Sequence, residues 1–220
     1  MKTVDLSHTI STETPVYPGT EPPVFTTPCT IENQGFTEKR ITLFSHTGTH
    51  MDAPSHILLE GKSLDRFPTE RFLGKAAVIN LIHIDHGKIE RYDLSQYEPL
   101  ILKIDFLLLH TGWYLKWGTD DYFKKYPVLT SAAARWLAGF PLKGIGVDMI
   151  SVDRTDTDTY PIHRVFLQNE ILIIENLTNL SELPDKIFSF FCFPLKIQDA
   201  DGSPVRAAAL ISESFFHDEA

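Results

Sequence analysis

The segment His46-Thr-Gly-Thr-His50-Met-Asp52-Ala-Pro-Ser-His56 places three imidazoles and one carboxylate within a short stretch of the chain. A helix would align the first two histidines, but the threonines, the glycine and the proline disfavour a helix here. In an extended chain, all four ligand-type side chains share one parity and leave the same face. The pattern therefore predicts a strand-like segment with its ligand-type groups on one side.

This segment must bend if its side chains are to meet one ion. Four residues of strand span roughly 13 Å, whereas an imidazole binds a metal at about 2 Å. Gly48 lies midway between His46 and His50, where a positive φ costs least. Asp52 converges with His50 directly, and the following proline turns the chain so that His56 approaches from the side.

Such a cluster indicates a catalytic metal site. Two imidazoles and a carboxylate suit zinc or manganese, whereas magnesium and calcium prefer more oxygen ligands. Three ligands from His46, His50 and Asp52 leave positions open, so that a metal-bound water can lose its proton and become the nucleophile. His56 is our candidate for the acid/base group that carries this proton to the leaving nitrogen. The alternative is that these histidines are ordinary core or surface groups, which suits an isolated histidine better than this cluster.

Several apolar runs on either side of the segment predict further strands. The expected strands are 38–44, 75–81, 101–110, 144–148, 171–175 and 187–193. Thr130 or Ser131 is expected to cap a helix to about Phe140, and Pro161 to Gln168 to form a helical turn. Residues 11–35 carry five prolines and are expected to form an irregular loop. Many strands with few long helices indicate an α/β or α+β sheet that is strongly curved or closed.

The bulk properties limit the classes of partner. The formal net charge of −9 disfavours nucleic acid and anionic membrane surfaces. No apolar stretch is long enough to span a bilayer, and the N-terminus lacks a signal-peptide core, so we expect a cytoplasmic protein. The two cysteines, Cys29 and Cys192, are far apart and are expected to be free, mostly buried thiols. Without repeats or linkers, residues 1–220 are expected to form one domain.

The eleven residues of the opening segment resemble the H-x-G-T-H-x-D-x-P-x-H signature of the bacterial kynurenine formamidase (arylformamidase) and cyclase superfamily of metal-dependent hydrolases. The resemblance extends over almost the whole chain. Other matching pieces are Val4-Asp-Leu-Ser-His8, Pro15-Val-Tyr-Pro-Gly19, His110-Thr-Gly-Trp113, Gly146-Val-Asp-Met-Ile-Ser-Val-Asp153, Glu175-Asn-Leu-Thr-Asn-Leu180 and Pro204-Val-Arg206.

The resemblance implies a role for each matching position. His46, His50 and Asp52 correspond to the ligands of a first metal, and Asp52 stands where a carboxylate bridges to a second. His163 and Glu175 correspond to two later ligands, which implies one or two zinc or manganese ions per chain.

The same resemblance bears on catalysis and assembly. His56 corresponds to the acid/base residue, and Tyr17 stands where the formamidases usually carry a tryptophan that lines the substrate pocket. The family fold is an α/β sheet curled into a barrel-like core with flanking helices, assembled as dimers or tetramers. We therefore expect an α/β fold with a curved, barrel-like mixed sheet, a small-molecule substrate and a homodimer or homotetramer.

Other polar residues were weighed on their sequence context. Glu175 ends an apolar strand, so it is equally compatible with a ligand and with a strand-end residue that reaches solvent. His110 follows a buried strand and could line the pocket, whereas Asp153 to Asp158 is expected to be an exposed loop without ligands. His83 and His86 suggest a surface turn, and His217 a solvated tail. An aromatic pocket could draw on Tyr17, Phe25, Phe67, Trp113 and Tyr160.

The leading hypothesis is an amidase-type hydrolase that cleaves a small aryl formamide such as N-formylkynurenine, a reaction of tryptophan catabolism. Metal-bound hydroxide would attack the formyl carbonyl, and His56 would protonate the departing aniline nitrogen. One alternative is a hydrolase of a cyclic amide or lactone, similar to the isatin hydrolases, although Glu175 stands where those enzymes carry an amide. Another is a non-catalytic metal or small-ligand binding protein on the same scaffold.

Overall fold

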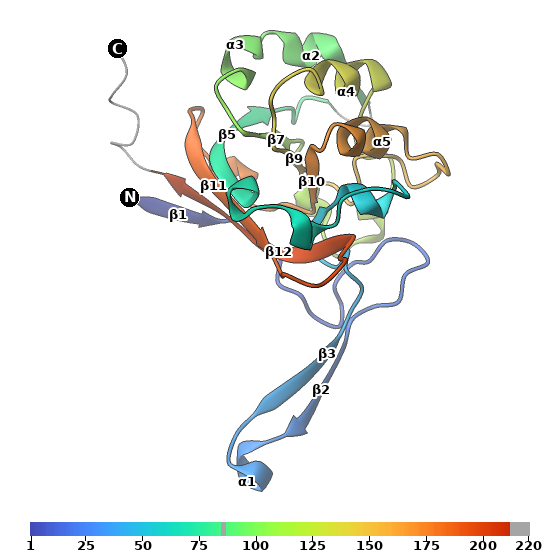
Figure 1. Ribbon diagram of the computed structural model, residues 1–220, viewed down its shortest axis with the longest axis vertical. Coiled ribbons are helices and arrows are strands. Elements are labelled where there is room, and N and C mark those ends of the chain that lie inside the picture. The colour runs from blue at the N-terminus through green and yellow to red at the C-terminus, as the bar shows by residue number, and fades with distance from the viewer. Residues whose placement is uncertain (85–86, 212–220) are drawn as a thin grey trace.

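The computed structural model describes residues 1–84 and 87–211 (Figure 1). The turn expected at His86 and the tail containing His217 lie outside the described residues. The strands are β1 (Lys2–Asp5), β2 (Val24–Cys29), β3 (Glu38–Thr42), β4 (His50–Asp52), β5 (Leu73–Asn80), β6 (Lys88–Ile89), β7 (Phe106–His110), β8 (Val128–Leu129), β9 (Gly144–Val147), β10 (Leu172–Glu175), β11 (Phe188–Pro194) and β12 (Gly202–Ile211). The helices are α1 (Ile31–Gln34), α2 (Arg91–Ser95), α3 (Glu98–Ile101), α4 (Ser131–Leu137) and α5 (Pro161–Gln168).

The main sheet closes on itself. Its strands run in the order β1-β12-β11-β5-β7-β9-β10-β4, and β12 pairs with β4 as well as with β11. The pairs β5–β7, β7–β9 and β9–β10 are parallel, and the others are antiparallel. The expected α/β fold with a curved, barrel-like mixed sheet is therefore confirmed. Among the described strands of this sheet, the closure leaves β1, which pairs with β12, at an edge.

Two apolar cores lie on opposite faces of this sheet. Along β7, Phe106 and Leu108 join a cluster that draws on strands all round the barrel and fills its interior. Leu107 and Leu109, of the opposite parity, join the cluster that includes the buried faces of α4 and α5. This alternation follows from the two-residue period of a strand. Along β7, it assigns side chains alternately to the barrel interior and to the outer face that the helices cover.

Several boundaries differ from the sequence-based expectations. The strand expected from Ile101 begins only at Phe106, because Ile101 ends α3 and is buried there as a helical residue. Pro161–Gln168 is a full helix rather than a turn. The helix cap is Thr130, whose hydroxyl accepts from the amide of Ala133 at 3.2 Å. The strand β12 was not predicted, because a proline near its start and a run of alanines hide its alternation.

The expectation of an irregular loop over residues 11–35 is wrong for its second half. There, β2 and α1 form, and β2 pairs with β3 in a separate antiparallel hairpin, which we call the arm. Pro28 cannot donate a backbone hydrogen bond, and it lies where the register of this hairpin shifts between Thr26 and Cys29. Figure 1 shows the arm projecting from the body of the molecule.

Among the described residues, no helix is both long and apolar enough to cross a bilayer.

Candidate metal centre

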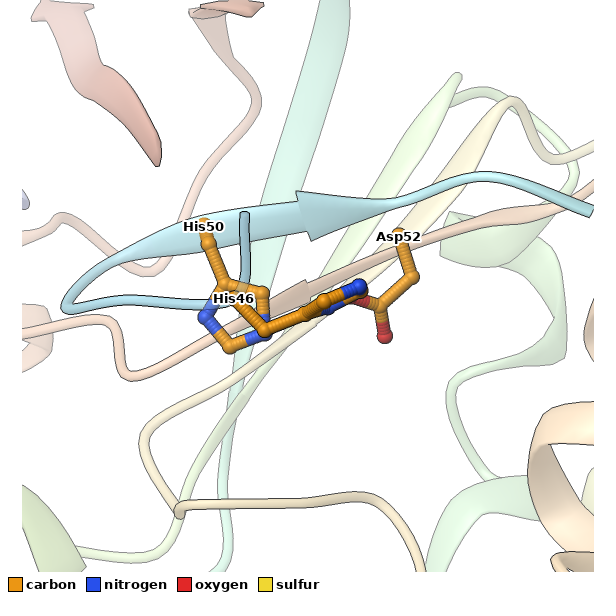
Figure 2. Close-up of side chains that lie close together, drawn as sticks. All are labelled: His46, His50 and Asp52. Carbon is orange, nitrogen blue, oxygen red and sulfur yellow. The ribbon is translucent and has the colours of Figure 1, made fainter. Parts of the chain in front are cut away.

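The opening segment adopts the predicted bend. Gly48 has a φ of +67°, and the chain reverses there before it enters β4. Residues Pro54–His56 then form a short 3-10 turn, so that the proline redirects the chain as expected. The side chains of His46, His50 and Asp52 consequently gather beside β4 (Figure 2).

These three side chains form a first compact group. Asp52 Oδ1 lies 2.8 Å from His46 Nδ1 and 3.3 Å from His50 Nε2. One candidate ligand atom from each residue lies within 4.8 Å of the others. His50 and Asp52 are buried, and His46 is partly exposed. The geometry is that of donors arranged around a common point.

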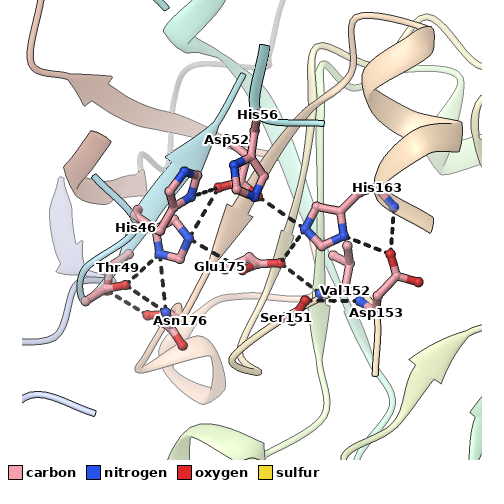
Figure 3. Close-up of polar contacts among 12 residues, drawn as sticks. His46, Thr49, Asp52, His56, Ser151, Val152, Asp153, His163, Glu175 and Asn176 are labelled. Atoms are coloured by element: carbon pink, nitrogen blue, oxygen red, sulfur yellow. Dashed lines mark hydrogen bonds and ion pairs between the residues drawn. The ribbon is translucent and has the colours of Figure 1, made fainter. Parts of the chain in front are cut away.

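A second group shares Asp52 with the first (Figure 3). His163 Nε2 lies 3.6 Å from Asp52 Oδ2 and 3.5 Å from Glu175 Oε1. Glu175 Oε2 in turn lies 3.4 Å from His50 Nε2. The side chains of His163 and Glu175 therefore lie next to those of the opening segment.

Sheet pairing explains this meeting. The antiparallel register of β10 and β4 places Glu175 directly opposite His50, and paired residues project from the same face. Met51 and Ile174 point into the barrel core, so His50 and Glu175 project from the outer face. The first turn of α5 brings His163 to the same place. Glu175 is therefore a buried group, and its alternative as a strand end reaching solvent is wrong.

Each of the three histidines is held at its second ring nitrogen. The outer contacts are His46 Nε2 to Asp201 Oδ2 at 3.0 Å, His50 Nδ1 to Gly48 O at 2.9 Å, and His163 Nδ1 to Asp153 Oδ2 at 2.8 Å. All three of these oxygens are acceptors. The Asn176 amide nitrogen also lies 3.3 Å from His50 Nδ1, but it donates to Gly48 O at 2.7 Å, so each ring donates outward from that nitrogen. The inward nitrogen of a neutral ring then carries a lone pair, as a metal ligand requires.

The electrostatics of the cluster fit a bound cation. Burial disfavours a charge on His50 and on His163. The carboxylates of Asp52 and Glu175, and for His163 also that of Asp153, outweigh burial and raise both pKa values to about 10. Burial likewise opposes ionisation of Asp52, yet the neighbouring imidazoles hold its pKa well below the usual range. Within the described part of the chain, the buried Asp52 Oδ2 accepts no hydrogen bond. A divalent cation would replace the protons and satisfy this orphaned oxygen.

The centre opens into a cavity of about 440 Å³. Its apolar and aromatic lining comes from Tyr17, Phe44, Ile57, Ile150 and Tyr160. Among the described residues, the lining contains no lysine or arginine. Of the aromatic candidates, Tyr17 and Tyr160 line the cavity, whereas Phe25, Phe67 and Trp113 do not.

His56 lies at the side of this centre. Its ring packs against that of His46, with centroids 3.9 Å apart, and its Nδ1 lies 3.4 Å from Asp201 Oδ2. Burial, helped by the neighbouring His46 and His163, lowers the pKa of His56, against the opposing effect of Asp52. The imidazole is therefore neutral near neutral pH, as a group that takes up a proton must be.

The structure corrects two expectations about polar residues near the centre. Asp153 is buried rather than exposed, because it accepts from the first amides of α5, those of Ile162 and His163, as well as from the His163 ring. His110 is buried against Tyr114 and does not line the cavity.

Asp201 was missed by sequence reasoning. It stands in Asp-Gly-Ser-Pro, a pattern typical of a turn, and its partners His46 and His56 are distant in sequence. The pairing of β12 with β4 brings it to the centre.

Comparison with known proteins agrees with this geometry. A family model described as "Putative cyclase" matches residues 4–154. The chain belongs to this cyclase family. The resemblance inferred from the signature is thereby confirmed.

Similarity to named proteins covers most of the chain. The kynurenine formamidase of Bacillus cytotoxicus is 31% identical over 206 residues, which cover 93% of this chain and 95% of that protein. Isatin hydrolase A from Labrenzia aggregata, solved with benzyl benzoate, has a TM-score of 0.86 at 26% identity, with 96% of this chain and 94% of that one covered. A predicted metal-dependent hydrolase from Bacillus stearothermophilus has a TM-score of 0.79 at 28% identity, with 94% and 97% covered. The comparisons support a hydrolase.

Proposed function

We propose that this cyclase-family chain is a metal-dependent hydrolase that cleaves a small aryl formamide, with N-formylkynurenine as the first substrate to test. The observation that carries the proposal is the pair of ligand groups sharing Asp52 beside an aromatic cavity. The named kynurenine formamidases among its relatives support the choice of substrate class.

The donor set supports a proposed ligand set for up to two ions. His46, His50 and Asp52 would hold one ion, and Asp52, His163 and Glu175 the other. Mixed imidazole and carboxylate ligands suit zinc or manganese. When bound, such an ion supplies Lewis acidity, which polarises a carbonyl oxygen and makes water acidic near neutral pH.

The chain's own residues supply proton transfer and positioning. With Nδ1 of His56 directed at Asp201, its Nε2 is the atom that takes a proton from water and delivers it to the leaving nitrogen. Tyr17, Phe44 and Tyr160 provide aromatic surface against which an aryl ring packs. Protonation of an aniline nitrogen matters because an anilide anion is a poor leaving group.

A second candidate is the opening of a cyclic amide or lactone. It is favoured by the high structural similarity to isatin hydrolase A. The two candidates differ in the substrate bond rather than in the site, so a substrate panel separates them. N-formylkynurenine carries charges on its amino-acid moiety, and the part of the lining that the structure describes has no lysine or arginine to bind its carboxylate. Formanilide is therefore the matched uncharged probe.

The test measures metal content alongside turnover. Purified protein loaded with zinc or manganese is assayed against N-formylkynurenine, formanilide, isatin and simple lactones. Hydrolysis of the formamides supports the leading proposal, and preference for isatin or a lactone supports the second. Tight metal binding without turnover of any probe would instead indicate a binding protein.

A substitution at His56 tests its proposed role as the acid/base group. His56→Ala should retain metal and lose about 10²- to 10⁴-fold in rate, the usual contribution of a general acid or base. His83→Ala, which removes an exposed histidine away from the cavity, is the matched control and should behave as wild type. Loss of metal from His56→Ala would show that His56 is a ligand.

We also propose that the substrate is a small molecule and that the protein is a homo-oligomer. In this assembly, the arm contacts a second copy of the chain. The arm strands pair only with each other among the described residues, and an isolated hairpin is marginal in water. Val24, Ile31, Phe36 and Ile41 on the arm are each more than half exposed. Phe44, just beyond β3, lines the cavity, so the arm is continuous with the site. Light scattering of wild type and of Phe36→Ser/Ile41→Ser tests this, and a monomeric wild type refutes it.

A further inference from the structure

Asp201 is fixed by its backbone and by its side chain at the point where the barrel closes. Its carbonyl accepts from the amide of Ala53 at 2.8 Å, directly after β4. Its Oδ1 accepts from the Ser45 hydroxyl at 3.0 Å. Gly202, the next residue, pairs with Asp52 in the register of β12 and β4. The carboxylate is therefore held in place independently of any histidine.

The other oxygen of this carboxylate is shared by two histidines with different proposed tasks. Asp201 Oδ2 lies 3.0 Å from His46 Nε2 and 3.4 Å from His56 Nδ1. The two rings pack with centroids 3.9 Å apart and planes tilted by 36°. One oxygen thus sets the orientation of a proposed metal ligand and of the proposed acid/base group together.

The contact with Asp201 determines which ring nitrogen of each histidine carries the proton. An ionised carboxylate only accepts, so both rings must donate to it, and a neutral imidazole has a single N–H. His56 then keeps its lone pair on Nε2. His46 faces a carboxylate at each ring nitrogen, so its Nδ1 offers a lone pair only when a bound ion replaces the Nδ1 proton, and its remaining N–H is then the one directed at Asp201. Nδ1 of His46 and Nε2 of His56 are the nitrogens that a metal ligand and a proton acceptor need.

We propose that Asp201 is a positioning residue that fixes the tautomers of His46 and His56, and this inference rests on the proposed function. Gly202 supports it independently. A Cβ at Gly202 would lie 2.4 Å from His46 Cε1, so the backbone beside Asp201 packs against the same ring that the carboxylate holds.

The competing assignment is a further metal ligand. Candidate ligand atoms of His46, His56 and Asp201 also lie within 4.8 Å of one another. However, His46 directs its Nδ1 to Asp52, and a single neutral imidazole offers one lone pair, so it cannot serve both groups. The Asp201 side chain is also 45% exposed, whereas that of Asp52 is 1% exposed. The experiment below distinguishes the two assignments.

The experiment compares Asp201→Ala and Asp201→Asn with Asp199→Asn in the zinc-loaded full chain. Asp199 is an exposed acid of the same loop that pairs with Arg66, so its variant changes charge without touching a histidine. Long-range ¹H–¹⁵N spectra of the histidine rings report each tautomer without any substrate. Zinc per chain, zinc affinity, kcat and KM complete the readouts.

Wild type and Asp199→Asn should show a single Nδ1–H tautomer for His56. In Asp201→Ala that ring should become a mixture, zinc per chain should stay unchanged, and zinc affinity should fall about 10- to 100-fold through His46. At saturating zinc, kcat should fall with little change in KM. Asp201→Asn keeps an accepting oxygen and should restore part of the Nδ1–H tautomer.

Two results would overturn the inference. One is a wild-type His56 tautomer in Asp201→Ala, and the other is a lower number of zinc ions per saturated chain, which would make Asp201 a ligand. If wild type hydrolyses no substrate, the proposed function fails, but the tautomer spectra still test the positioning role. The two failures are therefore distinguishable.

Discussion

Gly202→Ala should weaken metal binding through a steric effect on one ring. The added Cβ would lie 2.4 Å from His46 Cε1, 2.7 Å from Nε2 and 2.9 Å from Nδ1. Ordinary van der Waals contacts of a Cβ begin at 3.4 Å, so the ring or the strand must move by about 1 Å. His46 is held on both sides, at 2.8 Å from Asp52 and 3.0 Å from Asp201, so this movement breaks at least one contact.

The size of the loss in zinc affinity follows from how little displacement of a ligand a metal site tolerates. Ligand distances in such sites hold to within about 0.2 Å, so a shift of about 1 Å removes His46 as a ligand. Disturbing an outer partner alone costs about 10- to 100-fold in affinity, which sets the lower bound. We therefore expect a loss of at least about 1.4 to 2.8 kcal/mol in zinc binding. Zinc titration against a competing chelator measures it.

The control is a glycine with an equal clash elsewhere. A Cβ at Gly74 would lie 2.4 Å from Asp105 Oδ2, on β5 and away from the histidines. Both variants should lose about 1 to 3 kcal/mol of folding stability through overpacking. Only Gly202→Ala should lose zinc affinity. A folded Gly202→Ala protein with wild-type zinc affinity would refute the reasoning.

Three further predictions concern stability and reactivity. Burial lowers the pKa of His8 to about 4, so the folded protein should lose stability as the pH falls from about 6.5 to 4, where only the unfolded chain takes up this proton. His8→Phe keeps a ring stacked on Trp117. In denaturant titrations at several pH values, its free energy of unfolding should fall less steeply as the pH decreases, by a slope that corresponds to up to one proton, and an unchanged slope would contradict this. In the native protein, a thiol reagent should modify the partly exposed Cys29 but reach the buried Cys192, whose pKa burial raises, only after unfolding; rapid reaction of both would contradict this. Zinc at a hundred times its Kd should raise the free energy of unfolding by about 2.7 kcal/mol, with a smaller gain at the same zinc concentration in Glu175→Ala, and equal gains would remove Glu175 from the ligand set.

The central strands of the fold were predictable from sequence because they are buried on both faces. β7 and β10 consist of nearly unbroken apolar residues, and such runs are typical of strands inside a covered sheet. β12 and β4 carry no such run, since β12 includes a proline and alanines and β4 alternates ligand-type groups with Met51. These two strands close the barrel, so the sequence indicated a curved or closed sheet but not which strands close it.

The opening segment determined a large part of the site by local chemistry alone. The spacing of His46, His50 and Asp52, with Gly48 at positive φ, follows from chain geometry over a few residues. The sequence also carried the family signature, which pointed to His163 and Glu175. The first conclusion depends on which residues are neighbours in the chain, and the second depends on the resemblance to the family.

Only the tertiary structure decided what surrounds those candidate ligands. Asp201 reaches His46 because β12 pairs with β4, and Asp153 reaches His163 because its carboxylate caps α5. An isolated aspartate before a glycine, or in a polar run, has no local feature that distinguishes it from a solvated turn. Strand register and burial place each of these carboxylates beside a particular ring nitrogen, and both depend on the closed sheet as a whole.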